Sequence, residues 1–458
     1  MNSVNRGEKE FFRYVLPTTG AMLSFSVYTM TSGIIVARGE GEAALAALNL
    51  SMPLVNLMFA VSVLLSVGAA TVIGIYKGRG NTRLASRTFT EDLLAVLGTA
   101  LVFTLVTTLF PHEVARFLGG TELTLEYAAE YIRTTGFFAA AYMISYNLEV
   151  MASADGRPNM AFAGVLTCGA VTAGLGWLFV VRMGLGMFGA ALSAGLGQVA
   201  SILVFLTHFL SKRAKLKLSF EKPLQGFFRR VLPLGFSDFS NEVALALTAF
   251  LYNRVLLMAV GEQGVVSYAV VSYVNTLVVM LLAGVSQGSQ PLVSRSRGAR
   301  DYKHMFSLYG YGLRSALVMG LGVLGVCFAF APNIVPLLLE NSSEALPHTV
   351  DAMRLFAFAF PLMSVNIVTS GFLAASEAPG YSTAISLGRG LLLAPVLYAL
   401  AALGATKGLW LSSAVSEGLC LIASVVLLRR RKSELCEPKP RMYYPAPASA
   451  TAGARERE

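Results

Sequence analysis

The sequence carries little charge for its length. Of its 458 residues, only 14% are Asp, Glu, Lys or Arg, whereas 55% are hydrophobic and the mean hydropathy is +0.62. Soluble domains carry about 25% charged residues. So few charges cannot cover the surface of a water-soluble fold, and a disordered chain would contain far fewer apolar residues. The composition therefore excludes an ordinary soluble enzyme and indicates an integral membrane protein.

Residues typical of metal and redox sites are also scarce, with four cysteines and four histidines. No two cysteines have a spacing typical of metal or disulfide chemistry, and the histidines lie in loops or at the ends of apolar runs. The phosphate-binding loop of an ATP-driven pump is absent. A membrane-embedded enzyme would need His, Asp or Glu clustered at one membrane face, and there is no such cluster. We therefore expect neither an enzyme nor a metal centre.

What the sequence does contain is twelve long apolar runs. Spanning segments must be helices, because lipid offers backbone groups no hydrogen-bond partners, and the runs lack the two-residue alternation of barrel strands. We predict an all-α integral membrane protein with twelve transmembrane helices. The runs are 14–36, 48–75, 93–110, 134–152, 160–181, 187–210, 231–259, 265–293, 308–332, 355–376, 381–403 and 408–428.

The net charge of +10 is distributed as in a membrane protein, not as in one that binds nucleic acid. Lys and Arg occur in short clusters between the apolar runs. With the N-terminus inside, inside loops carry roughly three times as many Lys and Arg as outside loops, as the positive-inside rule requires. We expect a multi-pass protein of the cytoplasmic membrane with both termini cytoplasmic.

The two halves of the chain repeat each other at an offset of 216 to 222 residues. Both halves contain six runs, so they are parallel repeats, and such repeats typically form a transport site at their interface. We predict an N-terminal half at 1–210, a basic cytoplasmic linker at 211–230, a C-terminal half at 231–432 and a disordered tail at 433–458. The matches are FFRYVLP at 11–17 with FFRRVLP at 227–233, Gly68 with Gly288, Gly78 with Gly298, Asn147 with Asn366 and Gly186 with Gly408.

Several motifs give the chain a family resemblance over almost its whole length. They include Gly68-Ala69-Ala70-Thr71, Asp155-Gly156-Arg157-Pro158, Gln287-Gly288-Ser289-Gln290-Pro291 and Gly408-Leu409-Trp410. In order and spacing they resemble the multidrug and toxic compound extrusion (MATE) transporters. The resemblance implies two V-shaped lobes of six helices each, here called the N-lobe and the C-lobe. It also implies export of small amphipathic organic compounds, by antiport against H⁺ or Na⁺ with no other cofactor. We expect a monomer.

The chain departs from the family where acids are usual in the N-lobe. Ser32 stands where the family has an Asp in the first helix, and Thr172 and Gly176 lie near its Asn and Asp in the fifth. We therefore expect no carboxylate switch in the N-lobe. A lipid-linked oligosaccharide flippase of the same superfamily is the alternative. Such flippases often have extra spans and a basic cavity, whereas the cavity candidates here are acidic or neutral.

Glu242 is the candidate coupling residue. It lies 12 residues past Arg230, or about 18 Å along a helix, which is close to the middle of a bilayer. Burial there disfavours the charged form of a carboxyl, so this group can exchange protons. The candidate cavity residues around it are Tyr28, Asn147, Asn253, Asn275, Gln287, Gln290 and Asn366.

Three further charged residues lie in or near the apolar runs. Glu417 and Arg389 have similar estimated depths, which favours a structural ion pair between the last two helices. Glu149 lies six residues before Asp155, and we expect it near the cytoplasmic interface.

Overall fold

The structure of the chain is a computed structural model that describes residues 2–40, 42–221, 224–337, 339, 345–404 and 406–435. All regular secondary structure in these residues is helical, as predicted. The expected linker 211–230 is shorter, because the next helix already begins at residue 227. The expected tail 433–458 lies outside the described residues from 436 onward.

Each predicted run coincides with one helix or with two consecutive helices. In the N-terminal half these are α1 (Asn2–Glu40), α2 (Glu42–Gly78), α3 (Thr82–Leu109), α4 (Pro111–Phe117), α5 (Leu125–Phe137), α6 (Ala139–Ala154), α7 (Pro158–Gly176), η1 (Trp177–Arg182) and α8 (Gly186–Phe209). In the C-terminal half they are α9 (Phe227–Ala259), α10 (Glu262–Gly298), α11 (Tyr302–Ile334), η2 (Val335–Leu337), α12 (Leu346–Ala357), α13 (Ala359–Ala375), α14 (Pro379–Ala402), α15 (Thr406–Leu409) and α16 (Ser412–Leu435).

The fourth span of each half is interrupted at matching positions. Phe138 separates α5 from α6, and Phe358 separates α12 from α13, at the repeat offset of 220 residues. Within the described residues, eleven helical stretches are long and apolar enough to cross a membrane. The remaining run is α5 with α6, whose two pieces of 13 and 16 residues are each short of a full span. Together they complete the twelve spans.

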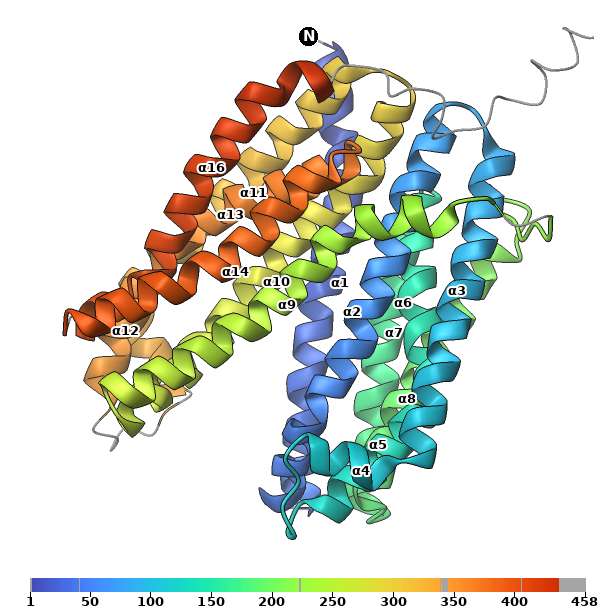
Figure 1. The fold of residues 1–458 in the computed structure, drawn as a ribbon. Coiled ribbons are helices and arrows are strands. Elements are labelled where there is room, and N and C mark those ends of the chain that lie inside the picture. Colours follow the sequence, from blue (N-terminus) through green and yellow to red (C-terminus); the bar gives the residue numbers. More distant parts are fainter. Residues whose placement is uncertain are drawn as a thin grey trace, which may run out of the picture.

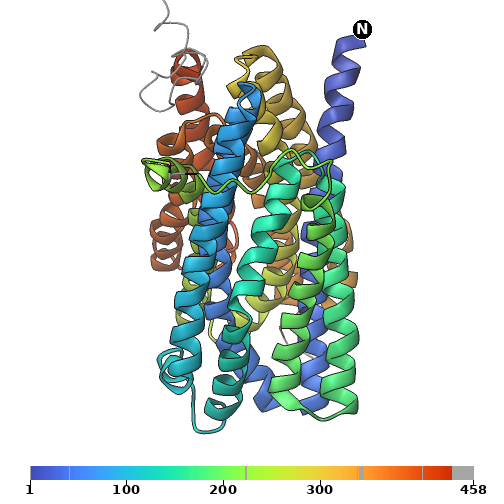
Figure 2. The ribbon, with the colours of Figure 1, turned by 90° about the vertical axis from the view of Figure 1, so that its right-hand side faces the viewer.

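The helices form two bundles that diverge toward the end opposite the N-terminus (Figure 1). A view at right angles shows the long helices of the N-lobe side by side (Figure 2). The first helix of each half crosses to the other: α1 packs against both α7 and α10, and α9 packs against both α14 and α2. These two sets of contacts correspond under the repeat. The lobes are therefore related by an approximate two-fold axis and exchange equivalent contacts.

Glycines allow the closest approach between the lobes, and they do so in matched pairs. A Cβ on Gly68 of α2 would overlap the carbonyl oxygen of Val231 on α9, and one on Gly288 of α10 would lie 2.9 Å from the Cα of Val15 on α1. Gly78 and Gly298, near the C-terminal ends of α2 and α10, are equally close to backbone of the opposite helix. The repeated glycines thus mark the apex of the V, where two backbones touch.

Each lobe also closes its own helices at this end with a buried ion pair. In the N-lobe, Lys77 Nζ lies 2.8 Å from Asp155 Oδ1, and His208 Nε2 lies 2.9 Å from Asp155 Oδ2. In the C-lobe, Arg297 Nε lies 3.3 Å from Glu377 Oε2. In both cases a cation near the end of the second span meets an acid just after the fourth. These pairs hold the linker end of each bundle together.

The segment between α8 and α9 is held on the N-lobe by its backbone. The amide of Lys217 donates to Ser86 Oγ at 3.2 Å, and the amide of Ser219 donates to Thr90 Oγ1 at 2.8 Å. Ser86 and Thr90 are four residues apart and lie on one face of α3. The linker therefore runs as a strap along the N-lobe before it reaches α9.

Candidate functional site

The main cavity lies among the C-lobe helices and opens toward the N-lobe. Helices α9, α10, α13, α14 and α16 supply most of its walls, and the space between them, open solvent included, is about 960 Å³. The N-lobe contributes only Met22 of α1 and Phe59 of α2. Its lining combines apolar side chains with polar and charged ones, as sites for small organic molecules do. We expected the transport site at the interface between the two halves. The cavity lies mainly on the C-lobe side of that interface.

Two carboxyls stand on the same face of α9 in this cavity. Asp238 and Glu242 are four residues apart, so one lies a single turn above the other, and both line the cavity wall. Gln290 of α10 donates to Asp238 Oδ1 at 3.3 Å, while Asp238 Oδ2 has no hydrogen-bond partner among the described residues. Like charges at this spacing repel each other. The pair is therefore a natural place for a positive charge to bind.

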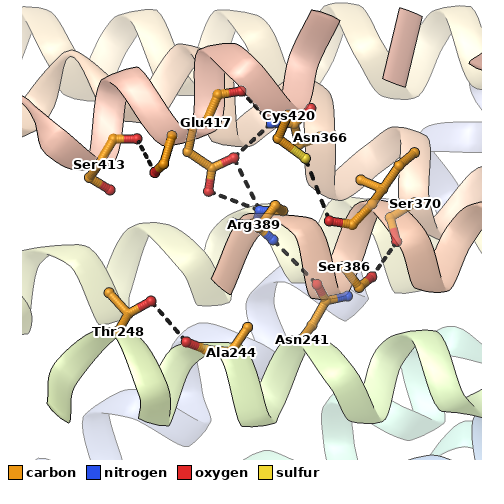
Figure 3. A network of polar contacts seen from close by, with 12 residues as sticks. Asn241, Ala244, Thr248, Asn366, Ser370, Ser386, Arg389, Ser413, Glu417 and Cys420 are labelled. Carbon is orange, nitrogen blue, oxygen red and sulfur yellow. Dashed lines mark hydrogen bonds and ion pairs between the residues drawn. The ribbon is translucent and has the colours of Figure 1, made fainter. Parts of the chain in front are cut away.

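A third carboxyl in the cavity is neutralised by an arginine. Arg389 Nε of α14 lies 2.9 Å from Glu417 Oε1 of α16, which confirms the predicted ion pair between these helices. Figure 3 shows Arg389 between Glu417 and Asn241, whose Oδ1 accepts from Arg389 Nη1 at 3.3 Å. Asn366 of α13 donates to Glu417 Oε2 at 2.7 Å. Every charge in this cluster is thus paired, which is the condition for burying an ion pair without a large penalty.

The structure brings together part of the predicted set of site residues. Glu242, Asn275 and Gln287 line the main cavity. Gln290 donates a hydrogen bond to Asp238, which lines that cavity, and Gln290 also lines a second hollow. Asn366 is fully buried behind the wall, where it bonds Glu417.

Asn253 does not join this set, because its side chain is exposed near the end of α9. It lies 11 residues beyond Glu242, just over three full turns, so it shares the face of Glu242 but lies about 16 Å farther along the helix. At that distance it is outside the cavity.

The two N-lobe candidates, Tyr28 and Asn147, do not line the main cavity either. Aromatic rings connect Tyr28 to it instead: Tyr28 contacts Phe25 at 5.2 Å, Phe25 stacks on Phe59 at 5.9 Å, and Phe59 contacts Tyr146 at 4.7 Å between ring centroids. Of these four rings, Phe59 reaches the cavity. Tyr146 is close enough to Asp238 and Glu242 to interact with both electrostatically. The N-lobe wall is thus aromatic, with Phe59 at its surface.

A second hollow of about 440 Å³ lies between the lobes and shares Gln287 with the main cavity. Glu149 of α6 lines it, opposite Gln287 and Gln290 of α10. Glu149 therefore faces the other lobe, although its position in the sequence had suggested the membrane surface. The main cavity and the second hollow therefore meet at the polar side chain of Gln287, at the interface between the lobes.

The N-lobe holds carboxyls away from the positions of Ser32 and Gly176, and the expectation that it has no carboxylate switch stays a prediction. Ser32 and Gly176 are where the resemblance places missing acids, yet Asp92 of α3 is completely buried in the same lobe. It accepts from Asn147 Nδ2 at 2.5 Å, and the same nitrogen donates to Ser66 Oγ at 2.9 Å. Glu149 of α6 is another carboxyl of the N-lobe helices, and it lines the second hollow.

Sequence reasoning missed Asp238 and Asp92 for different reasons. Asp238 precedes Glu242 by one helical turn, and that spacing was a usable signal. Asp92 was placed outside the predicted run 93–110, but α3 begins at Thr82, ten residues earlier. In the described residues, no group of three or more His, Cys, Asp or Glu side chains can hold a metal ion.

Known proteins match the chain over most of its length. The MatE family profile matches residues 17–178 and 241–399, more than half of the chain. The multidrug export protein MepA of Staphylococcus aureus (strain MSSA476) is 22% identical over 443 residues, which cover 94% of this chain and 96% of that protein.

Two solved structures share the fold at 20% identity and a TM-score of 0.88. One is an outward-facing multidrug resistance MATE family transporter of the MOP superfamily, matched over 94% of this chain and 96% of its own. The other is a MOP superfamily transporter from Pyrococcus furiosus whose binding pocket is described as having reverse polarity, matched over 96% and 99%. The twelve helices in two lobes are thus an arrangement already seen in transporters.

Proposed function

The chain belongs to the MatE family, and on that premise we propose that it is a secondary active antiporter that exports amphipathic organic cations across the cytoplasmic membrane. The observation that carries this proposal is the pair Asp238 and Glu242, which lacks a paired cation among the described residues, in a cavity with otherwise largely apolar walls. An amphipathic cation can place its charge at the two carboxyls and its apolar part against Phe59 and Met22. The multidrug export by the Staphylococcus aureus relative supports this choice of substrate class.

Coupling follows from competition at the same carboxyls. A proton or Na⁺ at Glu242 neutralises the charge that holds an organic cation, so uptake of the ion from outside favours release of the substrate. A ligand shifts an equilibrium between two arrangements only by its different affinity for each. Glu242 would meet this condition, because it interacts electrostatically with Tyr146 of the opposite lobe, and a movement between the lobes would change that interaction.

The arrangement of the lobes suggests which side is open. The matched glycine contacts close the apex at the linker end, and the bundles diverge from there (Figure 1). The positive-inside rule places the linker in the cytoplasm. We therefore propose an outward-facing state, in a monomer with both termini cytoplasmic.

The residues that line the same cavity do not favour the flippase alternative. Recognition of a lipid diphosphate needs unpaired basic side chains, yet the described cavity wall contains one arginine, Arg389, and that group is paired with Glu417. Three carboxyls line the same space. Since the family consists of transporters and the cavity needs no bond-breaking step to serve one, we propose no catalytic activity.

Transport in everted membrane vesicles tests the proposal. A fluorescent lipophilic cation and an anionic dye of similar size are supplied, and the proton and sodium gradients are collapsed separately. We expect cation accumulation that stops when one of the two gradients is removed, with little accumulation of the anion. Accumulation independent of both gradients, or equal accumulation of the two dyes, would contradict the proposal.

Orientation is tested separately by cysteine accessibility. Glu122, before α5, and Lys212, in the linker, are both exposed. In intact cells, an impermeant thiol reagent should label Glu122→Cys and leave Lys212→Cys unlabelled until the membrane is opened. The reverse pattern would place the linker outside.

A further inference from the structure

Asp92 is the most completely buried carboxyl outside the main cavity among the described residues. Its residue is 0% exposed, and it lies ten residues inside α3, where α3 packs against α2 and α6. α6 supplies Asn147, which donates to Asp92, and α2 supplies Ser66, which accepts from the same amide nitrogen. Neither neighbour carries a charge, so the three side chains together hold one ionisable group.

Two oxygens of this cluster have no partner among the described residues. They are Asp92 Oδ1 and Asn147 Oδ1, and both belong to residues that are 0% exposed. A buried polar atom without a hydrogen bond is energetically costly, and more so if it is charged, so two together need an explanation. Both atoms are acceptors and are available to a small ligand.

Charged groups on the surrounding helices are engaged elsewhere. Asn147 is the polar side chain that interacts with Asp92, and no charged group of the described residues does so. On α2, Lys77 pairs with Asp155, and on α3, Arg87 lies 3.6 Å from Glu221. The remaining nearby ionisable groups face other partners: Glu91 accepts from the amide of Leu224, Glu149 lines the second hollow, and Glu126 of α5 lies 3.4 Å from His112 of α4.

The C-lobe shows how a similar cluster is neutralised. Asn366, which matches Asn147 in the repeat, bonds Glu417, and the guanidinium of Arg389 sits on that carboxyl at 2.9 Å. The N-lobe has the amide and the carboxyl without the guanidinium. An uncompensated carboxylate inside a membrane bundle is strongly unfavourable, so another positive charge must take the place of the arginine.

We propose that Asp92, Asn147 and Ser66 form a binding site for one small monovalent cation, taken up as Na⁺ or as a proton. The ligands are all oxygens, which suit a hard cation, and the single formal negative charge matches a single positive one. Ca²⁺ takes about six to eight oxygen ligands and Mg²⁺ usually keeps several waters, whereas this cluster is fully buried and offers few oxygens. Ser66 lies two turns from Phe59 on α2, so occupation of the site acts on the helix that carries the N-lobe surface of the main cavity.

The site is tested by binding to full-length protein in lipid nanodiscs, with no exported compound present. The wild type is compared with Asp92→Asn, which keeps the size of the side chain, and with Glu242→Gln, which removes the candidate coupling carboxyl of the main cavity. Thermal unfolding is followed while NaCl replaces choline chloride at constant ionic strength. Infrared spectra follow the carbonyl band of protonated carboxyl groups as the pH is varied.

Sodium binding at Asp92 would raise the unfolding midpoint of the wild type and of Glu242→Gln, and that shift would be lost in Asp92→Asn. Proton binding would instead give a pH-dependent carbonyl band that Glu242→Gln keeps and Asp92→Asn loses. Either result supports the site and identifies its cation. If Asp92→Asn retains both responses of the wild type, the site does not exist.

Should Asp92→Asn not fold, Asn147→Ala decides the question. Loss of the amide oxygen should raise the Na⁺ concentration for half of the stabilisation about tenfold or more, or shift the carbonyl band because its hydrogen-bond donor is gone. An unchanged sodium titration together with an unchanged band would overturn the proposal. Because no transport is measured, this result is independent of whether the proposed export is correct.

Discussion

The two lobes bury an asparagine at matching positions and use it against different acids. In the N-lobe, Asn147 meets Asp92 of α3, the third span, with no guanidinium of the described residues nearby. In the C-lobe, Asn366 meets Glu417 of α16, the sixth span, together with Arg389. The glycines, the broken fourth span and the ion pairs at the linker end are shared between the lobes, whereas the acids that bond the two asparagines are not. The repeat therefore preserves the frame on which the lobes meet, and the charged groups inside the bundles differ in each lobe.

The largest expected effect concerns Glu242 of the main cavity and Glu149 of the second hollow. Glu242→Gln keeps the size of the side chain but fixes its neutral form, so gradient-driven export should fall at least tenfold in the vesicle assay. Glu149→Gln is the matched N-lobe change, and we expect it to retain most of the export. Equal loss in both variants would show that the lobes share the coupling role.

The next effect compares Glu417, whose charge Arg389 neutralises, with Asp92 of the N-lobe. Arg389→Met leaves Glu417 buried without its cation and should destabilise the protein by about 3–5 kcal/mol. Adding Glu417→Gln removes the charge and should restore most of that loss. Asp92→Asn in the N-lobe leaves no buried arginine without its partner. It should therefore destabilise the protein less than Arg389→Met does. Chemical unfolding in lipid nanodiscs measures all three.

A third test asks whether the two halves of the apex are equivalent. Gly68→Ala and Gly288→Ala each place a methyl group against backbone of the opposite lobe, which should cost about 1–3 kcal/mol in the closed arrangement. Spin labels across the linker end should report a similar widening for both. Gly322→Ala, which has open space around it, is the control. A widening in only one variant would mean that the approximate symmetry does not extend to the energetics.

The smallest effect belongs to the strap, which the N-lobe alone holds. The hydrogen bond from Arg83 keeps the pKa of Glu221 below its usual range. This contribution to stability is therefore complete above the unfolded pKa of about 4.3 and is lost as the pH falls through the lower folded value. Glu221→Gln should remove a small stabilisation at neutral pH that vanishes in acid. Exposed Glu122→Gln is the control, and an equal change there would contradict the assignment.

Much of the fold could be predicted because a bilayer restricts the alternatives. All twelve apolar runs are helices in the structure, and the Arg389–Glu417 pair followed from similar depths on neighbouring spans. Depth along a helix follows from counting residues at 1.5 Å each. The depth of Glu242 could therefore be inferred from its distance to Arg230 along the chain.

What could not be predicted depends on the positions of neighbouring helices. Asn253 lies on the same face of α9 as Glu242, but the cavity does not extend that far. Asp92 was missed because an apolar run ends at the first charged residue even where the helix continues. Asn147 was expected in the cavity, yet it points to α2 and α3 within its own lobe. Such contacts are set by packing between distant segments, which one sequence does not specify.

The strap along α3 fixes how much free chain connects the two lobes. The amide of Leu224 is the last one held by the N-lobe, through Glu91, and α9 begins at Phe227. Only Gln225 and Gly226 lie between them, and Gly226 has a φ of +76° with nothing within 4 Å of its missing side chain. This connection spans about 10 Å at full extension. It therefore keeps the two lobes close together at the linker end. Any movement between the lobes would therefore be smallest at this end and largest at their far ends.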